Sequence, residues 1–210
     1  MKTIKTLNAL VFTTAILVLF ASCSNSSNDE EQSSSTSFQV KGVSYDTTIG
    51  EDSGMTLEFI GDFEEFGGGS EYVLTVFGAN SNLNLEALVQ FNLLVKDNTS
   101  PFGDYTIVDT DEGNIPQDDI NAELEATLNA SGRVILDAPC FVSFFDENAN
   151  GFLIAHYPSE GLIVTKNSDG NTTIRYTGSQ FKRFDNNTGD FVESIDVSLH
   201  VTGTLLELLD

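Results

Sequence analysis

Residues 83–95 read LNLEALVQFNLLV, and apolar side chains occupy nearly every second position of this stretch. The alternating apolar set is Leu83, Leu85, Ala87, Val89, Phe91, Leu93 and Val95. Successive side chains of an extended strand point to opposite faces of a sheet. The stretch therefore predicts a β-strand with one buried face and one solvated face.

Two further stretches repeat this period of two. One runs from Ala122 through Leu124 and Ala126 to Leu128, with Glu, Thr and Asn near or between these positions. The other covers residues 195–201, where Ile, Val and Leu alternate with Asp, Ser and His. Both patterns predict half-buried strands.

Shorter apolar runs at residues 72–77, 141–145 and 151–157 predict strands that are buried on both faces. Turn-forming residues separate the runs, as in NSDGN at 167–171 and DNNTGD at 185–190. The polar stretch 109–119 contains Pro116 and predicts a loop. We count about ten strands and no convincing amphipathic helix, so the sequence predicts an all-β fold, a single antiparallel sandwich or barrel over residues 38–210.

The N-terminus predicts a removable signal peptide at residues 1–22. Lys2 and Lys5 precede an apolar run, Leu10 to Phe20, that is too short to span a bilayer. The run LFASC at 19–23 resembles a bacterial lipobox, although Phe20 stands where Leu is usual. The resemblance implies a lipid on the sulfur and the amine of Cys23, and hence a membrane as partner. The alternative is ordinary signal cleavage beside an unrelated cysteine.

Residues 23–37 predict a flexible tether, because they are rich in Ser and contain an acidic trio at 29–31. This acidic run resembles the export signal of surface-exposed lipoproteins of the Bacteroidota. The segments 38–45, 103–107, 161–165 and 201–205 resemble, in their order, a group of uncharacterised Bacteroidota lipoproteins with a β-sandwich or calycin-like barrel. The resemblance covers most of residues 38–206 and implies a fold and an outer-membrane location, at the cell surface or facing the periplasm. It implies no activity.

The charge balance excludes nucleic acid as an expected partner. The chain has 9 Lys and Arg against 32 Asp and Glu, a net charge of −23. Binding to phosphate backbones needs clustered basic side chains.

One motif suggests a cation. The run 146–151 reads DENANG, so Asp146, Asn148 and Asn150 have the spacing of the first ligands of a Ca²⁺ loop. The match then ends, because Tyr157 stands where the bidentate Glu is expected. The alternative is a plain hairpin tip. No other cofactor is predicted.

The remaining reactive residues form no recognisable catalytic set, and we assign no catalytic residue. The P-loop, nucleophile-elbow and HExxH motifs are absent from the sequence. His156 and His200 lie far apart in the chain, and Cys140 is predicted to be a small buried side chain. Asp46 and Thr47 begin a short run that resembles the O-glycosylation motif of Bacteroidota envelope proteins, with Thr47 as the acceptor.

Two functions remain open from the sequence. The first is a non-catalytic envelope lipoprotein that presents loops for binding or adhesion, with a surface glycan or a protein as partner. The absence of Trp lowers the expectation of a sugar-binding platform. The second is a small hydrolase or a ligand-carrying barrel that uses loop carboxylates. A cleft with two facing carboxylates would favour the second function, and a filled core would favour the first.

Overall fold

A computed structural model describes residues 37–49, 52–108, 117–146, 151–185 and 188–208. All of them belong to one compact unit, Ser34–Asp210. The predicted signal peptide, Cys23, and Asn148 and Asn150 of the predicted Ca²⁺ loop lie outside the described residues.

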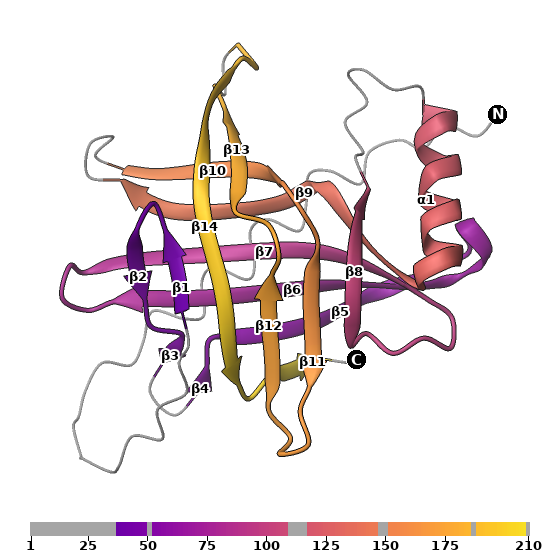
Figure 1. Cartoon of the computed structure of the whole chain (residues 1–210), viewed down its shortest axis with the longest axis horizontal. Helices are drawn as coiled ribbons and strands as arrows, with labels where there is room; N and C mark the ends of the chain where they lie inside the picture. The colour runs from indigo at the N-terminus through magenta and orange to yellow at the C-terminus, as the bar shows by residue number, and fades with distance from the viewer. Residues whose placement is uncertain (1–36, 50–51, 109–116, 147–150, 186–187, 209–210) are drawn as a thin grey trace. The chain divides into compact units, whose positions relative to one another are not determined.

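The described residues are mostly β-structure (Figure 1). The strands are, in chain order, β1 (Ser37–Val40), β2 (Val43–Tyr45), β3 (Thr48–Ile49), β4 (Asp52–Ser53), β5 (Met55–Phe63), β6 (Gly69–Asn80), β7 (Leu85–Lys96), β8 (Gly103–Val108), β9 (Arg133–Asp146), β10 (Gly151–Pro158), β11 (Leu162–Lys166), β12 (Thr172–Tyr176), β13 (Gln180–Phe184), β14 (Phe191–Gly203) and β15 (Leu206–Leu208). A 3-10 helix, η1 (Glu65–Gly67), and one α helix, α1 (Gln117–Ser131), complete the set. The predicted all-β fold class is confirmed.

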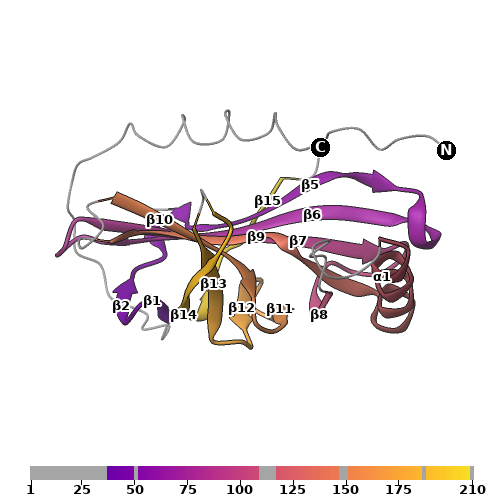
Figure 2. The ribbon, with the colours of Figure 1, turned by 90° about the horizontal axis from the view of Figure 1, so that it is seen from above.

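Thirteen of the strands form one sheet that folds over into two layers. The first layer contains the long strands β5, β6, β7, β9 and β10, with β15 at its edge (Figure 2). Most neighbouring strands are antiparallel, as predicted, whereas β15 runs parallel to β5 and β8 runs parallel to β9. The sheet is therefore mixed.

The second layer is built around β14. One edge of β14 pairs with β1, and the other edge pairs with β13 near its start and with β12 near its end. The layer continues from β12 through β11 to β8. The layers are joined at two places, where β13 pairs with β10 and where β8 pairs with β9.

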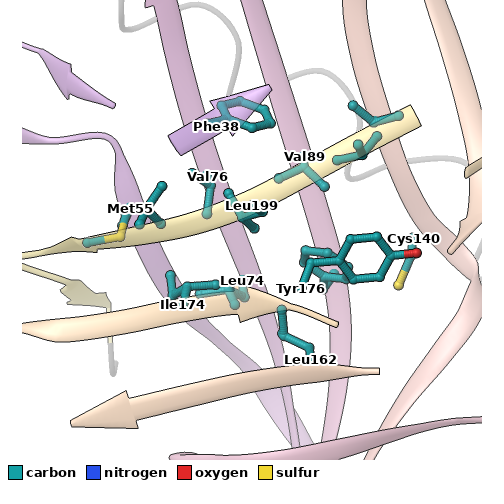
Figure 3. Close-up of a cluster of buried hydrophobic side chains, with 14 of the residues drawn as sticks. Phe38, Met55, Leu74, Val76, Val89, Cys140, Leu162, Ile174, Tyr176 and Leu199 are labelled. Atoms are coloured by element: carbon teal, nitrogen blue, oxygen red, sulfur yellow. The ribbon is translucent and has the colours of Figure 1, made fainter. Parts of the chain in front are cut away.

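The hydrophobic core lies between the layers. Leu74 and Val89 of the first layer meet Ile174 and Leu199 of the second, and none of the four is more than 1% exposed (Figure 3). The buried set of β7 runs from Leu85 at every second position, as the opening pattern predicts. Burial of each such side chain contributes about 1.5–3 kcal/mol.

One element contradicts the sequence analysis. Residues 122–128 are not a strand but part of α1, and the predicted loop 109–119 gives way to this helix from Gln117 onward. Ile120, Leu124 and Leu128 are buried, and their spacing of four residues puts them on one helical face. Gly132, at φ 73°, ends the helix, and its N–H donates to the carbonyl of Leu128.

The helix closes a second, smaller core. Leu124 and Leu128 pack with Leu94, Val108 and Val134 from β7, β8 and β9. In Figure 2, α1 lies on the same side of the first layer as the second layer does. The helix therefore covers the part of the first layer that the second layer leaves open.

Candidate functional site

The outer face of β10 is apolar and exposed. Phe152 and Ile154 are 62% and 46% exposed, while Ala155, on the inner face, is fully buried. Phe152 lies edge to face against Phe145 of β9, with 5.6 Å between ring centroids. The expectation that the run 151–157 is buried on both faces is therefore wrong.

Near its end, β10 contains a bulge that redirects a tyrosine. The β10–β13 pairing shifts register between His156 and Pro158, and Tyr157 between them has φ 55°. This left-handed conformation is costly for a bulky residue and persists only where the surrounding structure holds it. The bulge sets the Tyr157 ring against Phe184 of β13, at 5.4 Å between centroids.

Five rings form a continuous series, which we call the aromatic ridge: Phe141, His156, Tyr157, Phe184 and Phe191. Neighbouring rings lie 5.4–6.2 Å apart between centroids. The ridge crosses β9, β10, β13 and the start of β14, so rigid strands position all of its members. Phe191, at one end, is 57% exposed.

His156 is the titratable member of the ridge. Burial lowers the pKa of its imidazole below the ordinary value, and a hydrogen bond with the backbone of Cys140 partly offsets that effect. The neutral ring is therefore favoured at neutral pH, and it sits between the rings of Phe141 and Tyr157.

Four charged side chains, from the β1–β2 turn and from strands β9, β13 and β14, form a cluster: Lys41, Asp146, Arg183 and Glu193. The Lys41 ammonium lies 2.8 Å from a carboxylate oxygen of Asp146 and 3.8 Å from Glu193. Arg183 donates from Nε and Nη2 to the same Glu193 oxygen, each at 2.8 Å. The charged cluster links the β1–β2 turn to β9, β13 and β14.

Lys41 reaches this cluster from a two-residue turn. Val40 pairs with Val43, and both Lys41 and Gly42 have positive φ, which is the geometry of a type I′ hairpin. Asn or Gly is the usual residue at the first of these positions. The turn sets the Lys41 ammonium against Asp146 and 5.8 Å from the centroid of the Phe144 ring.

Asp146 belongs both to this charged cluster and to the predicted Ca²⁺ loop. Asp146 is 9% exposed, and one of its oxygens already accepts a hydrogen bond from Lys41. A bound Ca²⁺ would have to compete with that ammonium. Among the described residues, no group of three or more His, Cys, Asp or Glu side chains is arranged to hold a metal ion. Asn148 and Asn150 lie outside those residues, so Ca²⁺ binding stays a prediction.

A separate shallow hollow of about 420 Å³ lies where β10 leads into β11 and faces β8. Two carboxylates, Asp104 and Glu160, line it together with Ser159. The Ser159 Oγ accepts hydrogen bonds from the backbone N–H groups of Ser179 and Gln180, each at 3.3 Å. These contacts hold the bend in the chain.

The neighbouring tyrosine completes that arrangement. The Tyr176 hydroxyl donates to the Gln180 carbonyl at 2.8 Å and lies 3.1 Å from the Ser159 Oγ. The Tyr176 hydroxyl proton is thereby used, so the Ser159 hydroxyl is the donor between the two side chains. Burial raises the pKa of Tyr176, so its hydroxyl stays protonated at neutral pH and cannot take a proton from Ser159.

The other predicted residues are placed individually. Cys140 is fully buried, as expected, and accepts a hydrogen bond from the Asn92 N–H at the register shift between β7 and β9. His200 is exposed on the polar face of β14. Thr47 is 6% exposed in the folded domain, and its glycosylation stays a prediction.

The aromatic ridge is not among the features that the sequence predicts. Its members are separated by up to 50 positions, from Phe141 to Phe191, and only the topology brings them together. One signal was present, because residues 151–158 contain no side chain that is charged at neutral pH in a chain that is 20% charged.

No protein-family model, curated protein or solved structure matches this chain. Within the described ranges, no helix combines the length and the apolar character that crossing a bilayer requires.

Proposed function

We propose that this chain is a lipid-anchored envelope protein whose β-domain is a non-catalytic binding or adhesion module, displayed at the outer membrane through Cys23. The anchor rests on the lipobox-like run at 19–23, and acyl chains on Cys23 would hold the domain at the membrane. The single observation that carries the binding role is the aromatic ridge together with the exposed face of β10.

The ridge has the properties of a recognition surface. Aromatic side chains are enriched at binding sites because they bury a large area and lose little conformational entropy. Exposed apolar residues that form a contiguous patch mark interaction sites, whereas exposed apolar residues scattered singly are ordinary. Strands on both layers fix the ridge, so little ordering would be needed on binding.

The charge of the domain limits the partner. With a net charge of −23, the chain repels anionic surfaces and favours neutral or basic partners. A neutral surface glycan or a neutral to basic protein segment satisfies this condition.

The second candidate function is a small hydrolase or ligand carrier. The observation that favours it is the hollow at β10–β11, which Asp104 and Glu160 line together. The hydrogen bonds of Ser159 and Tyr176 give that hollow a structural role in holding the bend, so we rank it below the binding role.

The binding role is tested with substitutions on the ridge. The probes are neutral trisaccharides of glucose, mannose and N-acetylglucosamine, and a basic octapeptide of alternating Val and Thr with Lys at both ends. We expect at least one probe to bind, and Phe191→Ser to weaken its binding about tenfold, the equivalent of about 1.4 kcal/mol.

Leu83→Ser is the matched control, because Leu83 is 52% exposed and Phe191 is 57% exposed, and Leu83 is not part of the ridge. The control should bind like the unmodified chain. Equal loss in both variants, or failure of every probe to bind, would remove the support for the ridge as a binding surface.

A further inference from the structure

Strand β10 presents a backbone edge that is only partly used. One edge pairs with β9 at six consecutive residues, from Gly151 to His156. The other edge pairs with β13 only at His156 and Pro158. Among the described residues, therefore, Gly151 to Ala155 have no strand partner on the second side.

The reason is that β13 turns away from β10. Continued antiparallel pairing from His156–Lys182 would set Phe184 beside Ile154. The pairing of β13 with β10 ends at Lys182, so Phe184 has no partner on β10. On its other edge, β13 stays paired with β14 as far as Phe184–Phe191, after a register shift at Arg183. Figure 1 shows β13 and β14 continuing past β10. Within the described ranges, no strand therefore takes the place beside Gly151–Ala155 that β13 leaves.

The open edge lacks the usual protection. Natural edge strands carry Lys, Pro or inward-pointing charges that discourage pairing with other chains. Residues 151–155 read GFLIA and carry none of these, and Phe152 and Ile154 are exposed along the strand. The bulge at Tyr157 lies beyond this segment, and it places the aromatic ridge next to the C-terminal end of the segment.

We propose that the Gly151–Ala155 edge of β10 binds an extended segment of a partner protein, which adds to the first layer as a strand. This inference rests on the proposed binding role and names its partner class. Backbone hydrogen bonds would supply affinity, and Phe152, Ile154 and the ridge would select apolar side chains at alternate positions. The segment is neutral or basic, because the chain that receives it is strongly acidic.

Charge also decides against a second copy of this chain as the occupant. Two copies of a chain whose net charge is −23 would have to approach edge to edge, with mutual repulsion between them. A foreign segment without net negative charge meets no such barrier.

The test uses the full mature chain with Cys23→Ala and the same octapeptide of alternating Val and Thr with Lys ends. Hydrogen exchange of the backbone amides is measured with and without the peptide. We expect alternate amides within Gly151–Ala155 to become protected when the peptide binds. We also expect a peptide methylated at every backbone nitrogen, with unchanged side chains, to bind at least about tenfold more weakly.

Ile154→Lys is the protein variant, and Ile60→Lys on β5 is its matched control, because the two side chains are 46% and 45% exposed. We expect Ile154→Lys to abolish peptide binding and Ile60→Lys to leave it unchanged. The inference is overturned if the peptide does not bind, if protection falls outside β10, or if the methylated peptide binds equally well. It is also overturned if sedimentation shows a dimer whose β10 amides are protected without peptide.

These outcomes separate the two proposals. Trisaccharide binding that depends on Phe191, without any peptide binding, would retain the binding role and reject the strand-addition site. Failure of both classes of probe would reject both.

Discussion

At the scale of single residues, Lys41 shows how one side chain can join distant parts of the sheet. Its backbone has φ 50° in a turn where Gly or Asn would be more favourable. Its ammonium lies 2.8 Å from Asp146, which is 9% exposed, although Lys41 itself is about one-third exposed, at 36%. The ion pair with Asp146 therefore favours lysine at position 41, whereas the backbone conformation of the turn favours glycine or asparagine.

Replacing Lys41 by Gly separates these two effects. The substitution removes the backbone strain but also removes the cation from a nearly buried carboxylate. We expect a net loss of about 1–2 kcal/mol in the free energy of unfolding, measured by urea denaturation. A double-mutant cycle with Asp146→Asn should show coupling of at least about 0.5 kcal/mol. A Lys41→Gly variant as stable as the unmodified chain would contradict this role of the ion pair.

His156 gives the domain a specific response to pH. Burial lowers the pKa of its imidazole, so the unfolded chain takes up a proton at a higher pH than the folded chain does. The folded state therefore loses stability as the pH falls through the unfolded value of about 6.5. We expect the free energy of unfolding to be smaller at about pH 5.5 than at about pH 7.5.

The chain has two histidines, and the second supplies the control. His156→Gln should reduce the change in stability between these pH values, whereas His200→Gln, on the exposed face of β14, should leave it unchanged. Equal pH profiles for the two variants would mean that His156 is not the group responsible.

At the scale of elements, α1 and β10 show what the sequence pattern could and could not predict. Ala122, Leu124, Ala126 and Leu128 fit a period of two, but only Leu124 and Leu128 are buried, together with Ile120. The spacing of four was present in the sequence, and the helix-favouring Ala, Glu and Leu residues agreed with it. The period of two was misleading because it counted Ala122 and Ala126 as buried apolar residues, whereas alanine is also common on the exposed face of a helix.

This difference predicts an unequal response to substitution within α1. A strand would bury Ala126 and Leu128 on the same face, whereas the helix leaves Ala126 exposed. Leu128→Ala should cost about 2–5 kcal/mol in stability, because it opens a cavity in the second core. Ala126→Glu should change stability by less than about 0.5 kcal/mol. Large losses from both substitutions in thermal or urea unfolding would contradict the helix.

Strand β10 was predicted correctly as a strand and wrongly as buried on both faces. A continuous apolar run is compatible with a strand that is buried on both faces and also with a strand whose outer face is apolar and exposed. Sequence periodicity cannot distinguish them, because the difference lies in whether another layer covers the outer face of the sheet. On β10 the second layer covers the face of Ala155, and Phe152 and Ile154 on the other face are exposed.

At the scale of the whole molecule, the predicted all-β fold class is confirmed, and the pattern at residues 83–95 identifies a central strand of the first layer. The proposed binding surface could not be predicted in the same way, because its parts come from β9, β10, β13 and β14. The register shift at Tyr157 has one local signal, Pro158, since proline within a strand marks an edge or a bulge. That signal does not predict which rings the bulge brings together. The Cys23 anchor, in contrast, rests on the sequence alone.

We propose that Cys23 anchors this domain at the outer membrane with its ridge and the β10 edge exposed to the outside. The most direct test is digestion by added proteinase on intact cells, with Cys23→Ala as the control for anchoring. We expect the native protein to be digested while the cells remain unbroken, and we expect the Cys23→Ala chain no longer to fractionate with the membrane. Protection until the outer membrane is opened would contradict surface display, and membrane retention of Cys23→Ala would contradict the lipid anchor.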